Sequence, residues 1–296
     1  MFSKKTSKTS PCPKSPKLSY PFTPTCAEAS TLTTVTFPMK ENPMLLEQTF
    51  EKLAGMKLRG MVAALQHWKD GGMKGLEPSE LIGLLADSEW IDRENRRLSQ
   101  RLRDAHLPMA ATVEEIDYQH SRGLQKQKML ELISCRWIAA HQNLIITGPT
   151  GIGKTYLPCA LGNKACREGY KVHYARAPRL FGDLYQAKAD GSYPRLLQKL
   201  AKTHVLIIDD LGNSPLEPIE RCDLREVLED RYAQSSTIIT GQLDPTEWHS
   251  FIGDETIADA ICDRLVHNAH RLKLHGESIR KKYGLDNPPK QQSQKK

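Results

Sequence analysis

Residues 143–155 read NLIITGPTGIGKT and residues 204–212 read HVLIIDDLG, and these two stretches give the clearest indication of the fold class. Each begins with a short apolar run of the kind that forms a buried strand. The first run leads into the pattern G-x-x-x-x-G-K-[ST], which lies between a strand and a helix and surrounds phosphate groups. The second run ends in two carboxylates. Together they predict an α/β fold with a nucleotide site.

The first stretch supplies the candidate nucleotide-binding residues. Glycines at its corners let backbone N–H groups turn inward onto a polyphosphate, and the helix that follows adds its positive N-terminal end. Lys154 can reach the β and γ phosphates, and the Thr155 hydroxyl can bind Mg²⁺. The residues expected to contact the nucleotide are Gly148, Pro149, Thr150, Gly151, Ile152, Gly153, Lys154 and Thr155.

The second stretch supplies the acidic groups. Ligands of open α/β sheets bind at the carboxyl ends of the strands, which is where Asp209 and Asp210 fall. We expect Asp209 to serve Mg²⁺ through water and Asp210 to orient or deprotonate the attacking water.

From residue 142 the chain alternates strands and helices, which predicts a parallel sheet with covering helices. The expected strands are 143–147, 171–175, 205–209, 237–240 and 271–274, and the expected helices are 153–167, 178–188, 194–202, 219–233 and 255–267. The strand 171–175 lies between the two motifs, and another strand follows the second motif. This order favours ATPases with an additional strand over nucleotide kinases, for which no acceptor pocket or arginine-bearing lid is visible.

Upstream, residues 1–43 form a leader with 21 Ser, Thr or Pro residues, for which we expect disorder. We expect the native start to be Met44 or Met39. Residues 44–120 read as a small all-helical N-terminal domain, 121–283 as the ATPase domain and 284–296 as a basic disordered tail.

A helix expected over 88–105 places Arg93, Arg97 and Arg101 on the face away from its apolar stripe. One interpretation is a DNA-phosphate-contacting face, and the other is a solvated face with interleaved acids.

Charge and composition argue against a membrane-spanning, a secreted or a disulfide-rich protein. The net charge is +7, with +4 in residues 1–43 and +5 in 280–296, so the remainder is slightly acidic. Basic ends favour polyanions such as nucleic acid or act as solubilising tails. No apolar stretch is long enough for a membrane span, and no apolar run follows the N-terminal lysines as in a secretory signal. Seven scattered cysteines without a CxxC pair are typical of reduced thiols in a cytosolic protein.

A family resemblance rests on more than the phosphate loop. GPTGIGKT, ALGNKACREGY, HVLIIDDLG, EVLEDRY, IADAICDRLVHNAHR and GESIRKK resemble the IstB-like ATP-binding proteins of insertion sequences, which are AAA+ proteins related to the helicase loader DnaC. The resemblance covers roughly 44–283, and its most specific part is DRLVHNAHR followed by GESIRK.

The resemblance implies an ATP-dependent helper of transposition in the bacterial cytoplasm. It implies ATP and Mg²⁺ as ligands, assembly into a homo-oligomer on duplex DNA, and presentation of that DNA to a partner transposase. It also implies that Gln242 senses the γ-phosphate or the attacking water, that Arg264 is an arginine finger for a neighbouring subunit, and that Arg280 is a second sensor. Two alternatives remain open: a DnaC-like helicase loader, and a non-hydrolysing DNA-binding adaptor with ATP as a structural ligand.

Three positions depart from the family pattern. Pro158 falls inside the helix after the phosphate loop, where a proline costs about 3 kcal/mol unless the first turn of the helix absorbs it. Gly241 stands where Ser is usual, which predicts a looser sensor loop. Asp210 stands where many AAA+ proteins have Glu, although Asp is common in the IstB branch.

Overall fold

The computed structural model describes residues 43–72, 77–118 and 122–278. Contacts divide the chain into two compact units, Met1–Thr49 and Phe50–Lys296. Helix α1 (Pro43–Gly55) begins in the first unit and ends in the second, which holds every other described element.

Some sequence expectations fall outside these ranges. The leader apart from Pro43, the basic tail and Arg280 all lie outside the described residues.

Helices α2 and α3 of the second unit cross with their backbones close together. Helix α2 (Arg59–His67) ends in a π-helical turn (Trp68–Gly72) and packs on α3 (Pro78–Asp104). A Cβ atom added at Gly60 would lie 2.6 Å from the Cα of Glu89, so only glycine fits this crossing.

Helix α3 is a single helix. Glu77 and Glu80 form a capping box around its start, and Pro78 occupies its first turn. The expectation of a separate helix over 88–105 is wrong, because that segment belongs to α3, which begins at Pro78, and no proline or glycine interrupts the chain between 84 and 105.

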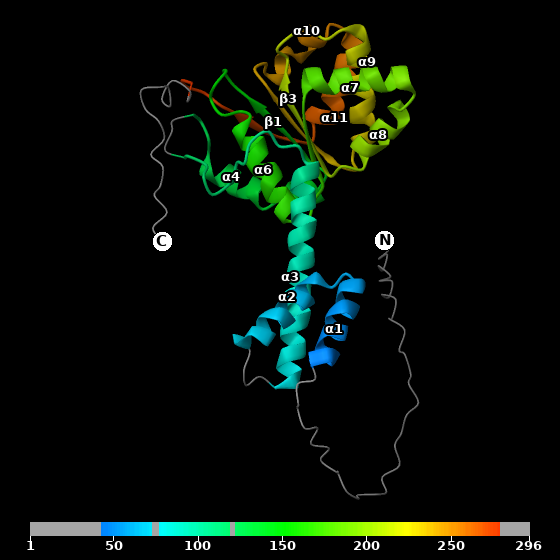
Figure 1. Cartoon of the computed structure of the whole chain (residues 1–296). Helices are drawn as coiled ribbons and strands as arrows, with labels where there is room; N and C mark the ends of the chain where they lie inside the picture. Colours follow the sequence, from blue (N-terminus) through cyan, green and yellow to red (C-terminus); the bar gives the residue numbers. More distant parts are fainter. Residues whose placement is uncertain (1–42, 73–76, 119–121, 279–296) are drawn as a thin grey trace, which may run out of the picture. The chain divides into compact units, whose positions relative to one another are not determined.

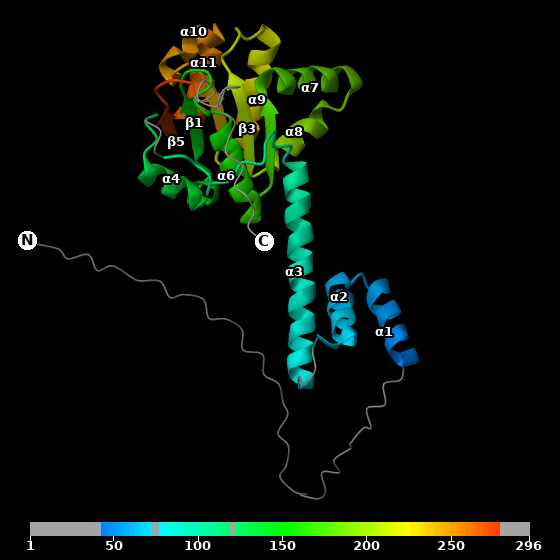
Figure 2. The same ribbon diagram turned by 60° about the vertical axis from the view of Figure 1, so that its left-hand side comes forward.

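Five parallel strands form one sheet with the order β2-β3-β4-β1-β5. The strands are β1 (Asn143–Thr147), β2 (Val172–Arg176), β3 (Val205–Leu211), β4 (Ser236–Gly241) and β5 (Ala269–Lys273). The additional strand β4 therefore lies between β1, which leads into the phosphate loop, and the acidic strand β3. All five strands were predicted from the sequence to within two residues at each end, and Figure 2 shows β1, β3 and β5 within the sheet.

Alternating strand residues serve two cores on opposite faces of the sheet. Leu144 and Ile146 of β1 pack in one core with α6, whereas Ile145 packs in the other with α7 to α11. Figure 1 shows α4 and α6 on one side of the sheet and α7 to α11 on the other. The helices are α4 (Lys126–Ile133), α5 (Arg136–Ala139), α6 (Tyr156–Arg167), α7 (Ala177–Asp190), α8 (Tyr193–Ala201), α9 (Pro218–Arg231), α10 (Trp248–Ile252) and α11 (Glu255–Val266), with a 3₁₀ turn at Pro245–Glu247.

The fold class inferred from the sequence is confirmed. The chain has an AAA+ P-loop fold, with a parallel sheet flanked by helices and preceded by helices α1 to α3. Across the three described ranges, none of the helices is long and apolar enough to cross a membrane.

Candidate nucleotide-binding site

The phosphate loop connects β1 to α6 and owes its path to glycine. Gly148, Gly151 and Gly153 have φ values of 151°, 84° and 94°, which L side chains rarely adopt. A Cβ atom added at Gly148 would also lie 2.6 Å from the carbonyl oxygen of Leu274. Because these residues lack side chains, the backbone N–H groups can come close to a phosphate.

Lys154 is held inside the loop. Its Nζ donates hydrogen bonds to the carbonyl oxygens of Gly148 at 2.7 Å and Pro149 at 2.9 Å, and the residue is 8% exposed. The ammonium is therefore stored at the loop centre, where phosphate oxygens can replace the carbonyls as acceptors.

Pro158 is accommodated without breaking the helix. Helix α6 begins at Tyr156 and not at residue 153 as predicted, because positive φ at Gly153 belongs to the loop. Pro158 is consequently in the first turn, where most backbone N–H groups have no partner inside the helix. The interior-helix cost expected from the sequence does not apply.

Asp209 lies towards the carboxyl end of β3, between β2 and β4, and is fully buried. Its carboxylate accepts a 2.6 Å hydrogen bond from the Tyr174 hydroxyl and another from the Thr240 hydroxyl. Burial together with the bond to Asp209 raises the pKa of Tyr174. Three adjacent strands thus hold the Asp209 carboxylate.

The backbone of Asp210 is left-handed, and it lies at an irregularity of the sheet. Its φ is 61°, and the register between β3 and β4 shifts between Ile208 and Leu211. The Asp210 side chain lines the cavity beside the phosphate loop, where its Oδ2 lies 3.9 Å from Nε of Arg176. The Asp210 N–H donates to Thr240 Oγ1 at 3.2 Å, so one hydroxyl contacts both aspartates. Strained backbone of this kind is concentrated at functional sites.

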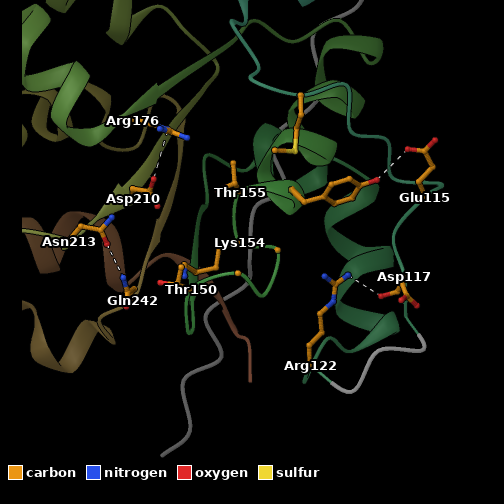
Figure 3. Close-up of a pocket in the computed structure, with 14 residues that line it drawn as sticks. Glu115, Asp117, Arg122, Thr150, Lys154, Thr155, Arg176, Asp210, Asn213 and Gln242 are labelled. Atoms are coloured by element: carbon orange, nitrogen blue, oxygen red, sulfur yellow. Dashed lines mark hydrogen bonds and ion pairs between the residues drawn. The ribbon is translucent and has the colours of Figure 1, made fainter. Parts of the chain in front are cut away.

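A cavity of about 560 Å³ gathers most of the predicted residues. Its described lining consists of Met109, Glu115, Asp117, Arg122, Thr150, Gly151, Gly153, Lys154, Thr155, Tyr156, Arg176, Asp210, Asn213 and Gln242. In Figure 3 the pairs Arg176–Asp210 and Asn213–Gln242 lie on one side of the phosphate loop, and Glu115, Asp117 and Arg122 lie on the other.

Several predicted residues support the cavity from outside its wall. Gly148 and Pro149 belong to the loop that carries Lys154, and the side chain of Ile152 is fully buried in the core. Asp209 lies behind the wall. Arg264 borders a separate hollow of about 70 Å³.

Sequence reasoning missed Arg176, Asn213 and Arg122. Gln242 Nε2 donates to Asn213 at 3.2 Å, so Asn213 orients the predicted sensor. Arg176 directly follows the strand residues KVHYA at the edge where ligands bind, and that position could have identified it.

Arg122 is buried beside the loop. It donates to the carbonyl oxygens of Ile152 at 3.3 Å and Asp117 at 2.9 Å, and burial lowers its pKa. Its contacts come from a segment without a local motif, so no sequence signal marked it.

Gly241 is required by packing. A Cβ atom at this position would lie 2.4 Å from the carbonyl oxygen of Leu211, and the residue is buried in β4. The glycine therefore allows β3 and β4 to approach closely, and the expectation of a looser sensor loop stays a prediction.

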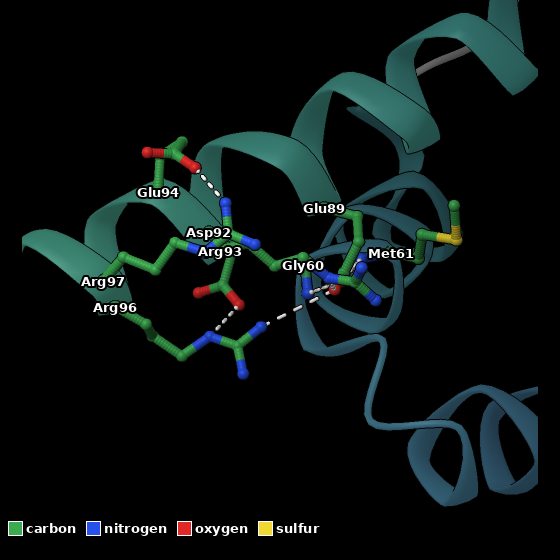
Figure 4. A network of polar contacts seen from close by, with 8 residues as sticks. All are labelled: Gly60, Met61, Glu89, Asp92, Arg93, Glu94, Arg96 and Arg97. Atoms are coloured by element: carbon green, nitrogen blue, oxygen red, sulfur yellow. Dashed lines mark hydrogen bonds and ion pairs between the residues drawn. The ribbon is translucent and has the colours of Figure 1, made fainter. Parts of the chain in front are cut away.

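The three arginines on α3 have different partners, and Figure 4 shows two of them. Arg93 Nε donates to Glu89 at 2.7 Å, and Arg97 Nη1 donates to Glu94 at 2.5 Å. Arg101 Nε donates to the carbonyl oxygen of Cys166 on α6 at 2.9 Å. They therefore do not form one row of uncompensated cations.

Glu89 is the centre of the polar contacts in Figure 4. Its carboxylate accepts hydrogen bonds from the backbone N–H groups of Gly60 at 2.8 Å and Met61 at 3.4 Å, at the start of α2. Burial alone would raise the pKa of Glu89, but the bonds from Arg93 and this backbone lower it overall. Part of the arginine charge thus stabilises the α2–α3 crossing.

The site fits a nucleoside triphosphate. A Cβ-free backbone cradle, a stored ammonium and the Thr155 hydroxyl meet the Asp210 carboxylate at the carboxyl edge of a parallel sheet, and the Asp209 carboxylate lies behind the wall. Hard oxygen donors of this kind suit Mg²⁺.

Comparisons with known proteins agree with this geometry. The family model described as IstB-like ATP binding protein matches residues 51–286. A Sinorhizobium fredii protein named as an insertion sequence ATP-binding protein is 49% identical over 239 residues, covering 80% of this chain and 98% of its own. The IS21 ATP-binding protein of Pseudomonas aeruginosa is 34% identical over 209 residues, covering 71% and 79%.

Solved structures include a similar chain, DnaI, at 20% identity and a TM-score of 0.48, covering 60% of this chain and 93% of that one. The family is established by the length of the family-model match and by the identity to the two insertion-sequence proteins. The chain belongs to the IstB-like ATP-binding proteins of insertion sequences.

Proposed function

We propose that this protein is an ATP-hydrolysing helper of transposition, which assembles on duplex DNA and presents it to the transposase of the same insertion sequence. The observation that carries the proposal is the convergence of Lys154, Thr155 and Asp210 on one cavity, with Asp209 behind its wall. The insertion-sequence names of the relatives support the setting, a bacterial cytoplasm.

The phosphate-loop residues bind ATP, and Thr155 and the acidic residues serve the metal and the attacking water. Lys154 leaves the carbonyls of Gly148 and Pro149 for phosphate oxygens. Thr155 and Asp209 would hold Mg²⁺, which neutralises phosphate charge when bound.

Water activation falls to Asp210. Its carboxylate enters the cavity from the irregular end of β3, and there it orients a water molecule and accepts its proton. Gln242, held by Asn213, lies in the same wall and senses the γ-phosphate or that water. Arg280 keeps its proposed role as a second sensor, outside the described residues.

Arg264 completes the site of another copy. It does not line the cavity of its own chain, and a guanidinium that stabilises phosphoryl charge raises rates by about 10³–10⁵-fold in arginine-finger enzymes. A homo-oligomer in which ATP lies between subunits gives it a target.

DNA binding would be mainly to phosphates, with the basic ends of the chain and the exposed Arg93 and Arg97 as candidate contacts. Arg101 is the weakest candidate of the predicted face, because its Nε is engaged by Cys166. Binding to phosphates predicts a slope of log affinity against log salt of about −0.9 per phosphate neutralised.

The test is hydrolysis of ATP with and without duplex DNA, together with electron microscopy of the protein on DNA in ATP and in ADP. The proposal predicts DNA-stimulated hydrolysis and an ordered assembly in ATP only. ATP binding without hydrolysis would support the adaptor alternative. Stable capture of a replicative helicase, without capture of a transposase of the same insertion sequence, would support the loader alternative.

A further inference from the structure

The guanidinium of Arg264 is fixed on one edge. It forms an ion pair through Nε with Glu229 of α9, and Nη1 donates to the carbonyl oxygen of Ala260 at 3.0 Å. Its contact with Glu229 is an ion pair and not a hydrogen bond, and within the described ranges both N–H groups on Nη2 have no hydrogen-bond acceptor. The end of the side chain farthest from the helix is therefore open to an outside acceptor.

The backbone under Arg264 is also fixed. Asn143, the first residue of β1, donates through Nδ2 to the carbonyl oxygens of Arg264 at 3.1 Å and Leu265 at 3.4 Å. Its Oδ1 accepts a 2.9 Å hydrogen bond from the N–H of Thr237 in β4. The strand that leads to the phosphate loop thus also holds the end of α11.

Glu229 stands on an equally rigid support. Two residues later, Arg231 is 1% exposed and donates to the carbonyl oxygen of Thr203 at 2.8 Å and to Thr237 Oγ1 at 3.0 Å. These bonds anchor the last turn of α9 to the loop after α8 and to β4. The pairing with Arg264 lowers the pKa of Glu229, so its carboxylate is charged at neutral pH.

We infer that Glu229 is a positioning residue, which holds Arg264 through Nε so that the Nη2 end is presented to ATP bound by a second copy of this chain. This inference rests on the proposed function, because it assigns a support to the arginine that completes the neighbouring site. A free arginine samples many rotamers, whereas transition-state stabilisation requires donors already in place.

The atom through which Arg264 pairs with Glu229 shows whether Glu229 holds the arginine in place or blocks it from binding phosphate. Phosphoryl oxygens accept two parallel N–H groups from the outer end of a guanidinium. Glu229 takes Nε and leaves Nη2 open, so it does not compete for the donors that a phosphate needs. A carboxylate that blocked the finger would have bound that outer end.

The first experiment compares Glu229→Ala with a matched control, Glu168→Ala. Glu168 forms an exposed ion pair with Lys164 on α6, away from the cavity and from Arg264, and both glutamates have a side-chain exposure of 48%. For Glu229→Ala we expect a kcat for DNA-stimulated ATP hydrolysis at least tenfold lower, with the Kd for ATP within twofold of wild type. The control should match wild type in both.

The second experiment separates positioning from a structural role. Asp210→Asn removes the water-activating carboxylate but keeps Arg264, so mixing it with Glu229→Ala creates junctions with an intact nucleotide site and a correctly held arginine from the neighbour. We expect the mixture to hydrolyse ATP faster than the sum of the two variants alone. A folding defect caused by Glu229→Ala would not be repaired by a neighbour.

Three outcomes decide the matter. Unchanged or faster hydrolysis by Glu229→Ala, or a mixture that only adds the separate activities, would overturn the positioning role while wild-type hydrolysis still supports the proposed function. Absence of hydrolysis by the wild type on duplex DNA would overturn both.

Discussion

The hydroxyl of Tyr174 donates a 2.6 Å hydrogen bond to the buried carboxylate of Asp209, from the strand next to the one that carries the acid. Thr240 on the other neighbouring strand adds a second bond to the same carboxylate. A buried carboxylate is stable only when it is paired or hydrogen-bonded. The three strands therefore fix the acid proposed to serve Mg²⁺ before any ligand arrives.

Tyr174→Phe should destabilise the protein, because it leaves a buried carboxylate with one donor fewer. Loss of a partner to a buried charged group costs about 1–3 kcal/mol. Urea unfolding measures the change, and Tyr185→Phe is the control, since Tyr185 is 66% exposed. Equal unfolding midpoints for the two variants would contradict this role of Tyr174.

Arg176→Ala should weaken ATP binding more than ADP binding, because Arg176 lines the cavity beside Asp210, which we place near the γ-phosphate. Its exposed position limits the effect to about 0.2–1 kcal/mol, or up to about fivefold in Kd. Fluorescence titration with both nucleotides measures it. Arg179→Ala is the control, since Arg179 is exposed and does not line the cavity. Equal losses for ATP and ADP would show that Arg176 does not contact the terminal phosphate.

Gly241→Ala should destabilise the protein by about 1–3 kcal/mol, because the new Cβ meets the carbonyl oxygen of Leu211 and the two strands must separate. The control is Gly182→Ala on α7, where a Cβ meets nothing within 4 Å and alanine should stabilise the helix by up to about 1 kcal/mol. Chemical denaturation of both variants gives the comparison. A neutral Gly241→Ala would contradict the packing requirement.

Acid should destabilise the fold through His173. Burial, with smaller contributions from Lys199 and His106, lowers the pKa of His173 from 6.5 to about 4. Below pH 6.5 the unfolded chain binds a proton that the folded chain refuses, so stability is complete above pH 6.5 and falls towards pH 4. The slope from one such group is at most about 1.4 kcal/mol per pH unit.

The measurement for His173 is the free energy of unfolding of wild type and His173→Phe at several pH values between 7 and 4. The variant should show a shallower loss. His204, whose pKa burial also lowers, contributes to both curves and cancels in the comparison. Parallel curves would remove His173 as a source of acid sensitivity.

Much of the sheet could be predicted because fully buried strands have a clear signal. The run LII in β1 and the run VLII in β3 are apolar on both faces, and they are followed by a glycine loop and by two aspartates. Helix boundaries were harder. The start of α6 depended on positive φ at Gly153, which periodicity does not report, and the unity of α3 depended on a continuous backbone whose apolar positions are irregular.

The site residues also fall into those that the sequence predicted and those that it did not. Residues in contiguous motifs, such as Lys154 and Asp210, were found. Asn213 directly follows the second motif but is not part of its pattern, and Arg122 comes from a segment without a motif, so neither was found. The charge pattern on α3 was visible, but its pairing was not. Which acid each arginine meets depends on the crossing of α2 at Gly60 and on contact with α6.

Isothermal titration calorimetry of the intact chain with ATP and Mg²⁺ measures whether the phosphate loop binds a nucleotide. The wild type should release or take up heat and saturate at one ATP per chain, Lys154→Ala should bind about tenfold to a hundredfold more weakly, and Lys164→Ala should match wild type, because only Lys154 lies inside the loop. Folded wild-type protein that gives no binding heat across temperatures, or Lys154→Ala that binds as tightly as wild type, would contradict the account.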